Sequence, residues 1–204
     1  MPDRLDHELK TARPRRGSPS QTRERLVAAA ASLFNRSGYH GTDSNRIARE
    51  AGYSTGLFYK HFKDKREIFL AVYETWVASE WEVAGAELTA GGKPDDLARR
   101  LVASMVNFHT RWRGLRASLI ELVFTDAKVR HFYRDQRRRQ LDLLARLRTA
   151  SGTPRRRREE DAIMLFTFER TSDAIAQGEL RDLGLNRKAV VGALEKILVA
   201  SLSQ

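Results

Sequence analysis

Residues 38–62 constrain the fold more than any other part of the chain, because they encode two short helices around one turn. The segment reads GYHGTDSNRIAREAGYSTGLFYKHF. Ile47, Ala48 and Ala51 fall at i, i+1 and i+4, which places them together on one face of the first helix. Gly52 then supplies the backbone freedom that a sharp turn needs.

The second short helix has a buried face and a polar face. Phe58 and Phe62 are four residues apart and point inward together. Thr42 and Ser54 are placed to cap the two helices, because a hydroxyl accepts a hydrogen bond from an unpaired backbone N–H. The outward face carries hydroxyl groups, a small residue and cations: Thr55, Gly56, Leu57, Tyr59, Lys60 and His61, with Lys65 just beyond. Such a face suits phosphates and base edges, so the pair predicts a helix-turn-helix whose second helix enters a DNA major groove.

Two longer amphipathic helices flank this pair. A helix over residues 20–37 ends at Gly38, and a further helix begins at about Lys65. The first has one apolar stripe, formed by Leu26, Val27, Ala30, Leu33 and Phe34. The other has a stripe formed by Ile68, Phe69, Val72, Tyr73 and Trp76.

Residues 20–70 as a whole resemble the DNA-binding domain of the tetracycline-repressor (TetR) family. The resemblance rests on Thr22-Arg23-Glu24-Arg25-Leu26, Ala29-Ala30, Leu33-Phe34, Gly38-Tyr39, Thr42, Ile47-Ala48, Ala51-Gly52, Gly56, Tyr59, His61-Phe62 and Lys65. It implies an all-helical dimeric regulator, with three helices that bind DNA and a variable helical domain that holds a small-molecule effector and the dimer interface.

The chain departs from the family pattern at two positions. Ser44 stands where the family usually has an apolar residue, and Arg46 where it often has an acidic one. Ser44 can donate to a phosphate, whereas Leu57 suits a thymine methyl group and Lys60 a guanine edge. The predicted DNA-binding residues are Thr42, Ser44, Ser54, Thr55, Gly56, Leu57, Tyr59, Lys60, His61 and Lys65.

The distribution of charge supports a nucleic-acid partner. The 204 residues carry a net charge of +11. Residues 1–66 hold 14 Lys and Arg against 7 Asp and Glu, so about a third of the chain carries most of the excess. Within residues 1–19, Arg13, Arg15 and Arg16 form a basic arm that either reaches a minor groove or stays solvated. The runs at 137–139 and 155–158 are expected to be solvated helix faces or termini rather than partner sites.

Other classes of protein are disfavoured by composition. The chain has no cysteine and no apolar run that suits a signal peptide or a membrane helix, so a cytoplasmic protein is expected. The 5 histidines lack metal-ligand spacing, and no Gly-rich phosphate loop or nucleophile elbow is present. We therefore expect no enzyme activity, and we assign no catalytic residue, metal site or cofactor.

The rest of the chain predicts further helices and no strands. Breaks at Gly and Pro divide it into helices near residues 65–89, 94–112, 115–126, 128–150, 155–178 and 186–202. The expected fold is all-α with about nine helices. Its parts are a flexible arm at 1–19, a DNA-binding domain at 20–66 and an effector-binding and dimerisation domain at 67–204.

The last two predicted helices have apolar stripes suited to a partner. One carries Ala162, Ile163, Leu165, Phe166 and Phe168, and the other carries Val190, Val191, Leu194, Ile197, Leu198 and Leu202. Two such helices from each of two chains would form a four-helix bundle across a two-fold axis. The competing interpretation is that both stripes pack within their own subunit, and the family resemblance favours the homodimer.

An effector pocket is expected among the middle helices, lined mainly by apolar and aromatic groups. The candidates are Trp76, Trp81, Met105, Phe108, His109, Trp112, Glu121, Phe124 and Phe168, together with Phe132, Met164 and Glu169. His109 and Glu121 are the polar members suited to orient an apolar or aromatic ligand, and core packing is the competing interpretation for the aromatic ones. Ligand binding would move the helix that starts at Lys65 and release a palindromic DNA operator.

One alternative of another kind remains. A DNA-binding protein of the same fold could organise DNA, or act through a protein partner, without a small-molecule inducer. An apolar cavity of at least about 300 Å³ among the middle helices would favour the inducer, whereas a solid core would favour the alternative.

Overall fold

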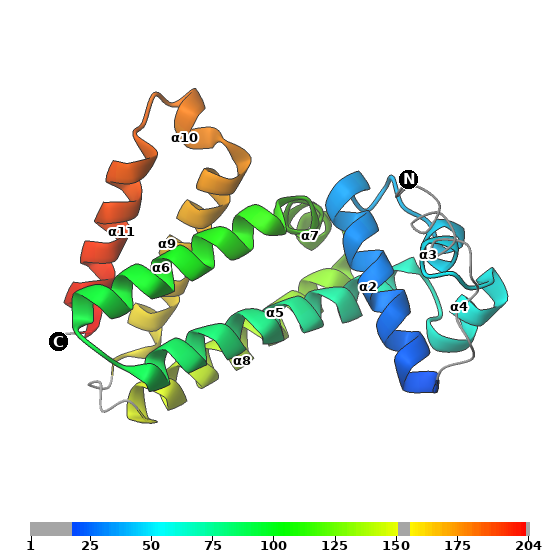
Figure 1. Ribbon diagram of the computed structural model, residues 1–204, viewed down its shortest axis with the longest axis horizontal. Coiled ribbons are helices and arrows are strands. Elements are labelled where there is room, and N and C mark those ends of the chain that lie inside the picture. The colour runs from blue at the N-terminus through cyan, green and yellow to red at the C-terminus, as the bar shows by residue number, and fades with distance from the viewer. Residues whose placement is uncertain (1–17, 151–155, 203–204) are drawn as a thin grey trace, which may run out of the picture.

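The computed structural model describes residues 18–150 and 156–202, and all regular structure within these ranges is helical. Figure 1 shows a small head of short helices beside an elongated body. The helices are α2 (Pro19–Ser37), α3 (Ser44–Glu50), α4 (Thr55–His61), α5 (Lys65–Ala90), α6 (Pro94–Arg111), α7 (Arg113–Thr125), α8 (Ala127–Ala150), α9 (Arg158–Gln177), α10 (Glu179–Asp182) and α11 (Arg187–Leu202). These ten helices confirm the all-α prediction; the additional one is the single turn α10.

The head consists of α2, α3 and α4, and its caps explain where the short helices begin. The Ser54 side chain accepts a hydrogen bond from the Leu57 N–H, as predicted, and Gly52 turns the chain with φ +77°. The predicted cap at Thr42 is wrong. Asp43 caps α3 instead, with its carboxylate accepting from the Arg46 N–H, since a charged acceptor suits the positive end of a helix.

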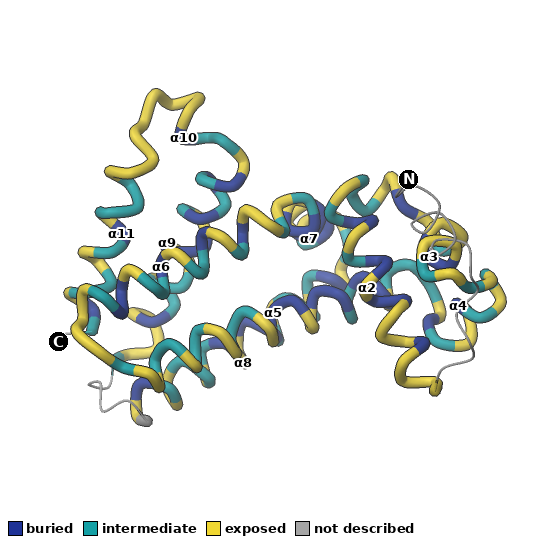
Figure 2. The backbone as a smooth tube through the Cα atoms, viewed as in Figure 1, coloured by how far each residue is buried: buried dark blue, intermediate teal, exposed yellow. Residues whose placement is uncertain are grey.

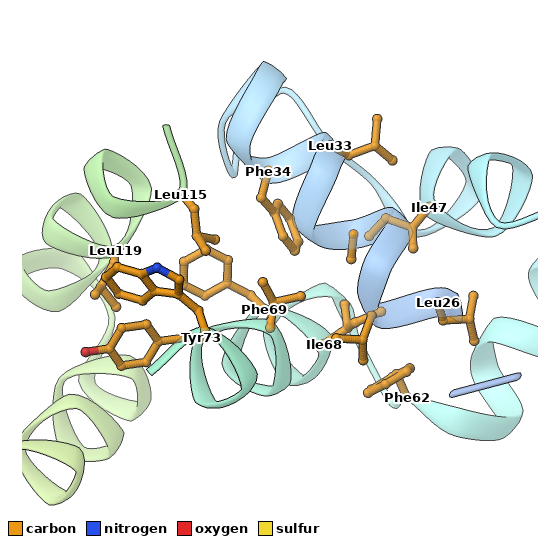
Figure 3. Packing of buried hydrophobic residues seen from close by; sticks show 14 of the residues in the cluster. Leu26, Leu33, Phe34, Ile47, Phe62, Ile68, Phe69, Tyr73, Leu115 and Leu119 are labelled. Carbon is orange, nitrogen blue, oxygen red and sulfur yellow. The ribbon is translucent and has the colours of Figure 1, made fainter. Parts of the chain in front are cut away.

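One apolar core runs from the head into the body. Figure 3 shows Phe34 of α2 next to Phe69 of α5, and Leu26 of α2 near Ile68 of α5. The apolar stripes predicted for α2 and for the start of α5 are all buried. Leu115 and Leu119 of α7 belong to the same cluster. The residues on either side of the predicted boundary between 66 and 67 therefore share a helix and a core.

The body is built around α5 and α6. Helix α6 packs against α9, α11 and α5, while α5 also packs against α8. Figure 2 shows that the buried part of α5 lies toward the head, and that much of the surface of α10 and α11 is exposed. The body thus has spare apolar surface at the end farthest from the head.

Candidate DNA-binding surface and effector cavity

The outer face of α4 is exposed at the surface of the head. Tyr59 is 56% exposed although it is a large aromatic residue, and its ring meets the ring of Phe58 edge-on at 5.2 Å. Gly56 and Lys60 are exposed beside it, and Leu57 is half-buried. The buried Phe58 ring thereby fixes the side of α4 that faces solvent, where the predicted contacts lie.

Several other predicted DNA-contacting residues make contacts within the head. The Thr55 hydroxyl donates to the Asn45 side chain of α3 at 2.8 Å, which ties the two short helices together. Ser44 is half-buried in the first turn of α3, and His61 is half-buried at the end of α4. Thr42 is 2% exposed and donates to the Gly38 carbonyl at 2.9 Å. Because its side chain lies in the interior, we leave Thr42 out of the surface proposed below.

The Lys65 side chain is hydrogen-bonded within the protein, which the sequence did not reveal. Its Nζ donates to the Tyr39 and Thr42 carbonyl oxygens, both at 2.9 Å, and lies 4.0 Å from the centre of the Tyr39 ring. Burial lowers the pKa of this ammonium group from its ordinary value. Arg46 likewise folds back, and its guanidinium donates to the Gly41 carbonyl. Both cations hold the turn between α2 and α3.

An apolar cavity of about 180 Å³ lies in the body, between α5, α6, α8, α9 and α11. Of the predicted effector residues, Trp81, Met105, Phe108 and Phe168 line it, and so do Met164 and Glu169. Sequence analysis missed the aliphatic walls formed by Val83, Leu88, Leu101, Leu144, Leu165, Leu198 and Leu202. These leucines and valines follow ordinary helical periodicity, so nothing in the sequence separates them from core residues.

The remaining predicted effector residues lie elsewhere. Glu121 is on an exposed part of α7, where its Oε1 lies 3.0 Å from the Nε2 of His40 in the head, and Phe124 is 78% exposed. Both predictions of a cavity position are wrong, because this end of α7 faces the head and solvent. Trp76 and Trp112 line a second hollow of about 320 Å³ between the head and the body. Phe132 packs near Tyr73 in the main core.

His109 does not line the cavity in the body; it is buried beside it, among charged groups. Its Nδ1 lies 2.8 Å from Asp173 Oδ1, and its Nε2 lies 3.5 Å from Glu80 Oε1. The second contact is an ion pair without hydrogen-bond geometry. Burial alone would lower the pKa of His109, but Asp173 and Glu80 outweigh it and raise the pKa to about 9. The imidazole is therefore a cation at neutral pH.

The ion pairs continue from His109 across the body. Arg116 of α7 contacts Asp173 and Glu169, both on α9. Arg137 of α8 also donates to Glu169 and, besides, to the Tyr133 hydroxyl. The prediction of a solvated face for residues 137–139 is thus wrong at Arg137, which is 7% exposed; Arg138 and Arg139 are exposed. These pairs join α7, α8 and α9 through buried charges that compensate one another.

Some predictions concern features outside these sites. The basic arm at 1–19 lies outside the described residues except for Ser18 and Pro19, and Arg155 lies outside them too. Among the described residues, no group of three or more His, Cys, Asp or Glu is placed to hold a metal ion. None of the helices described over 18–150 and 156–202 has the length and apolar character to cross a membrane.

Known proteins share the sequence of the head. Residues 26–72 match the family described as bacterial regulatory proteins, tetR family. The HTH-type transcriptional regulator AcrR of Shigella flexneri is 30% identical over 117 residues, which are 55% of this chain and 53% of AcrR. The head of the chain is thus similar to the DNA-binding domain of the TetR family. The HTH-type transcriptional regulator HbdR of Aromatoleum sp. is 41% identical over 64 residues, which are 31% of this chain and 28% of HbdR.

The chain thus spans about half the length of AcrR and less of HbdR. Both relatives are named as transcriptional regulators, in agreement with the expectation that this chain is not an enzyme.

Solved structures of transcriptional regulators share the whole fold. A TetR-family regulator from Rhodococcus sp. superposes with a TM-score of 0.73 at 18% identity, covering 90% of this chain and 99% of that one. FadR from Bacillus subtilis, in complex with stearoyl-CoA, superposes with a TM-score of 0.65 at 17% identity, covering 87% and 98%. At these identities the likeness concerns the fold alone.

Proposed function

We propose that this protein is a transcriptional repressor of the TetR family that binds a specific DNA operator through the outer face of α4. The observation that carries the proposal is the exposed surface of Gly56, Tyr59 and Lys60 on a helix whose other face is fixed in the core by Phe58. A recognition helix must be held firmly while its polar side stays free for phosphates and bases. The positive charge concentrated in residues 1–66 attracts the phosphate backbone.

The operator is proposed to be palindromic, because α9 and α11 suit a two-fold dimer. Ile163 and Phe166 of α9 are 63% and 53% exposed, and Ile197 of α11 is 43% exposed. Large exposed apolar side chains on two neighbouring helices are typical of an interface between subunits. Residues 67–204 would thus supply the dimer contact, and residues 20–66 the DNA contact.

A small apolar effector in the body cavity is proposed to release the DNA. Helix α5 links the two sites, because its first turns pack in the core with the head, and Glu80, Trp81, Ala84 and Leu88 line the cavity. Two recognition helices must meet half-sites about 34 Å apart or a multiple of that, so a small movement of α5 changes their fit. That FadR of similar fold holds stearoyl-CoA supports an apolar effector.

One observation favours the alternative, a DNA-binding protein without a small-molecule inducer. The cavity of about 180 Å³ is smaller than the roughly 300 Å³ expected of a site for a drug-sized ligand. An effector must therefore be small or displace lining side chains. The two functions differ in whether any small molecule changes the affinity for DNA.

The deciding experiment is a selection of duplexes from random sequence with the purified protein, followed by a ligand panel on the selected site. We expect a palindromic site, salt-sensitive binding and release by an apolar compound. Selection of a site with no effective ligand would support the alternative. No salt-sensitive binding to any duplex would refute both functions. The link through α5 is tested by Trp76→Ala, which should retain operator binding but weaken the response to the inducer.

A further inference from the structure

The hollow between head and body has the features of a separate binding site. Its volume is about 320 Å³, larger than that of the body cavity. One wall is α2 of the head, through Val27, Ala28 and Ala31, and the opposite walls come from α5, α6 and α7. The volume lies at the lower end of the range for small-molecule sites, about 300–1,000 Å³. None of the functions proposed above uses this hollow.

Aromatic rings dominate the body side of the hollow. Trp76, Phe108 and Trp112 all line it, and Trp76 stacks on Phe108 with ring centres 5.4 Å apart and planes inclined by 17°. Leu115 and Val72 complete the apolar wall. Flat aromatic walls favour a flat aromatic occupant, which gains both burial and ring contacts.

The polar groups of the hollow indicate a neutral ligand with a hydroxyl group. Arg23 and Glu24 both line it, so their opposite charges offer no net attraction to an ion. Thr75 and Ser79 add hydroxyls. A hydroxyl group of a ligand could accept from the Ser79 hydroxyl and donate its hydrogen to the Glu24 carboxylate.

Phe108 separates this hollow from the body cavity, because it lines both. The two spaces otherwise have different linings, with Trp81 on the body cavity and Trp76 and Trp112 on the hollow. The three tryptophans of the chain therefore report on the two spaces separately.

We propose that the hollow between α2 and α5–α7 is a second small-molecule site, which binds a neutral, planar aromatic alcohol between the head and the body. An occupant touches both parts of the protein at once and so holds α2 against the body. The site is independent of the proposed function, because its occupation requires neither DNA nor an occupied body cavity.

The test uses 2-naphthol as the probe, the full-length protein without DNA, and two matched variants. Ala28→Leu places a larger side chain in the hollow, and Ala84→Leu does the same in the body cavity. Calorimetric titration should show binding to the unaltered protein. Ala28→Leu should weaken it by about tenfold or more, since a packed side chain occupies the ligand's volume, whereas Ala84→Leu should change it by less than about threefold.

A second measurement does not depend on the folding of the two leucine variants. Protein labelled with 5-fluorotryptophan gives one ¹⁹F resonance for each tryptophan, assigned by single Trp→Phe changes. The probe should shift the resonances of Trp76 and Trp112 more than that of Trp81. A larger shift at Trp81, a loss of binding in Ala84→Leu alone, or no binding to the unaltered protein would overturn the proposed site.

Discussion

At the scale of single residues, the head separates exposed side chains, which we propose to read DNA, from side chains that hold its shape. Tyr59 and Lys60 are exposed on α4, and their side chains make no hydrogen bond or ion pair with the described part of the chain, so they are available to a ligand of this surface. Lys65 and Thr42 instead bond carbonyl oxygens of the turn between α2 and α3. The sequence predicted that the first pair is exposed, because it lies opposite the buried Phe58 and Phe62. It could not predict the hydrogen bonds of the second pair, because a lysine or threonine side chain can donate to a phosphate or to a carbonyl, and the residue type does not show which.

The first prediction concerns base reading by α4. Lys60→Ala should change which sequences the protein prefers, because a lysine at a base edge distinguishes guanine from other bases. Tyr59→Phe should weaken binding to all duplexes by a similar factor, because a phosphate contact carries no sequence information. Repeating the duplex selection with each variant measures both effects. A uniform loss with Lys60→Ala would identify Lys60 as a phosphate contact.

The second prediction concerns Lys65. Lys65→Met should lower the free energy of unfolding by about 1–3 kcal/mol, because two carbonyl oxygens lose their donor. Urea unfolding followed by circular dichroism measures the change, with the exposed Lys63→Met as control. DNA affinity should fall for all sequences alike. Unchanged stability with reduced affinity would show instead that Lys65 serves mainly as a phosphate contact.

The third prediction concerns His109 and pH. The pKa is about 9 in the folded protein and about 6.5 in an unfolded chain, so the charged imidazole stabilises the fold fully below pH 6.5. This contribution should be lost as pH rises from about 6.5 to 9, and it amounts to about 3 kcal/mol. Urea midpoints across that range measure it. His109→Gln should remove most of the slope; a slope that persists in this variant would place its origin elsewhere.

At the scale of helices, the junction of α6 and α7 is capped by a side chain from the head. Trp112 precedes α7 and provides no side-chain cap. The Asn35 side chain of α2 takes that role, since its Oδ1 accepts from the N–H groups of Gly114 and Leu115 and its Nδ2 donates to the Arg111 carbonyl. The helix boundaries were predictable from Gly and Pro positions, but this cap joins residues far apart in sequence and was not.

The fourth prediction tests this junction. A Cβ added at Gly114 would lie 2.0 Å from the Asn35 carbonyl oxygen, so Gly114→Ala must move α7 away from α2. We expect a loss of about 1–3 kcal/mol in unfolding free energy, typical of overpacking. Gly85→Ala is the matched control, because a Cβ there meets its nearest atom at 3.8 Å. Equal unfolding midpoints for the two variants would contradict the close approach.

At the scale of the whole molecule, the body presents apolar surface that a single chain does not cover. The fifth prediction is that Phe166→Glu yields a monomer, because it places a charge on the exposed face of α9. Sedimentation velocity measures the mass, and the exposed Asn107→Glu on α6, away from the proposed interface residues, is the control. The variant should also lose its affinity for a palindromic duplex. A dimer that survives Phe166→Glu would move the interface away from this face.

The core that Leu26, Phe34, Phe69, Tyr73 and Leu115 share has a consequence for protein engineering. A fragment that ends at residue 66 would lack the rings of Phe69 and Tyr73, which share a core with α2, and we expect this fragment to be unfolded. Chimeras that exchange the DNA specificity of two such proteins should therefore be cut after the third turn of α5 and should bring along the matching face of α7. The part that must be exchanged is defined by the shared core, and it extends beyond the helix-turn-helix.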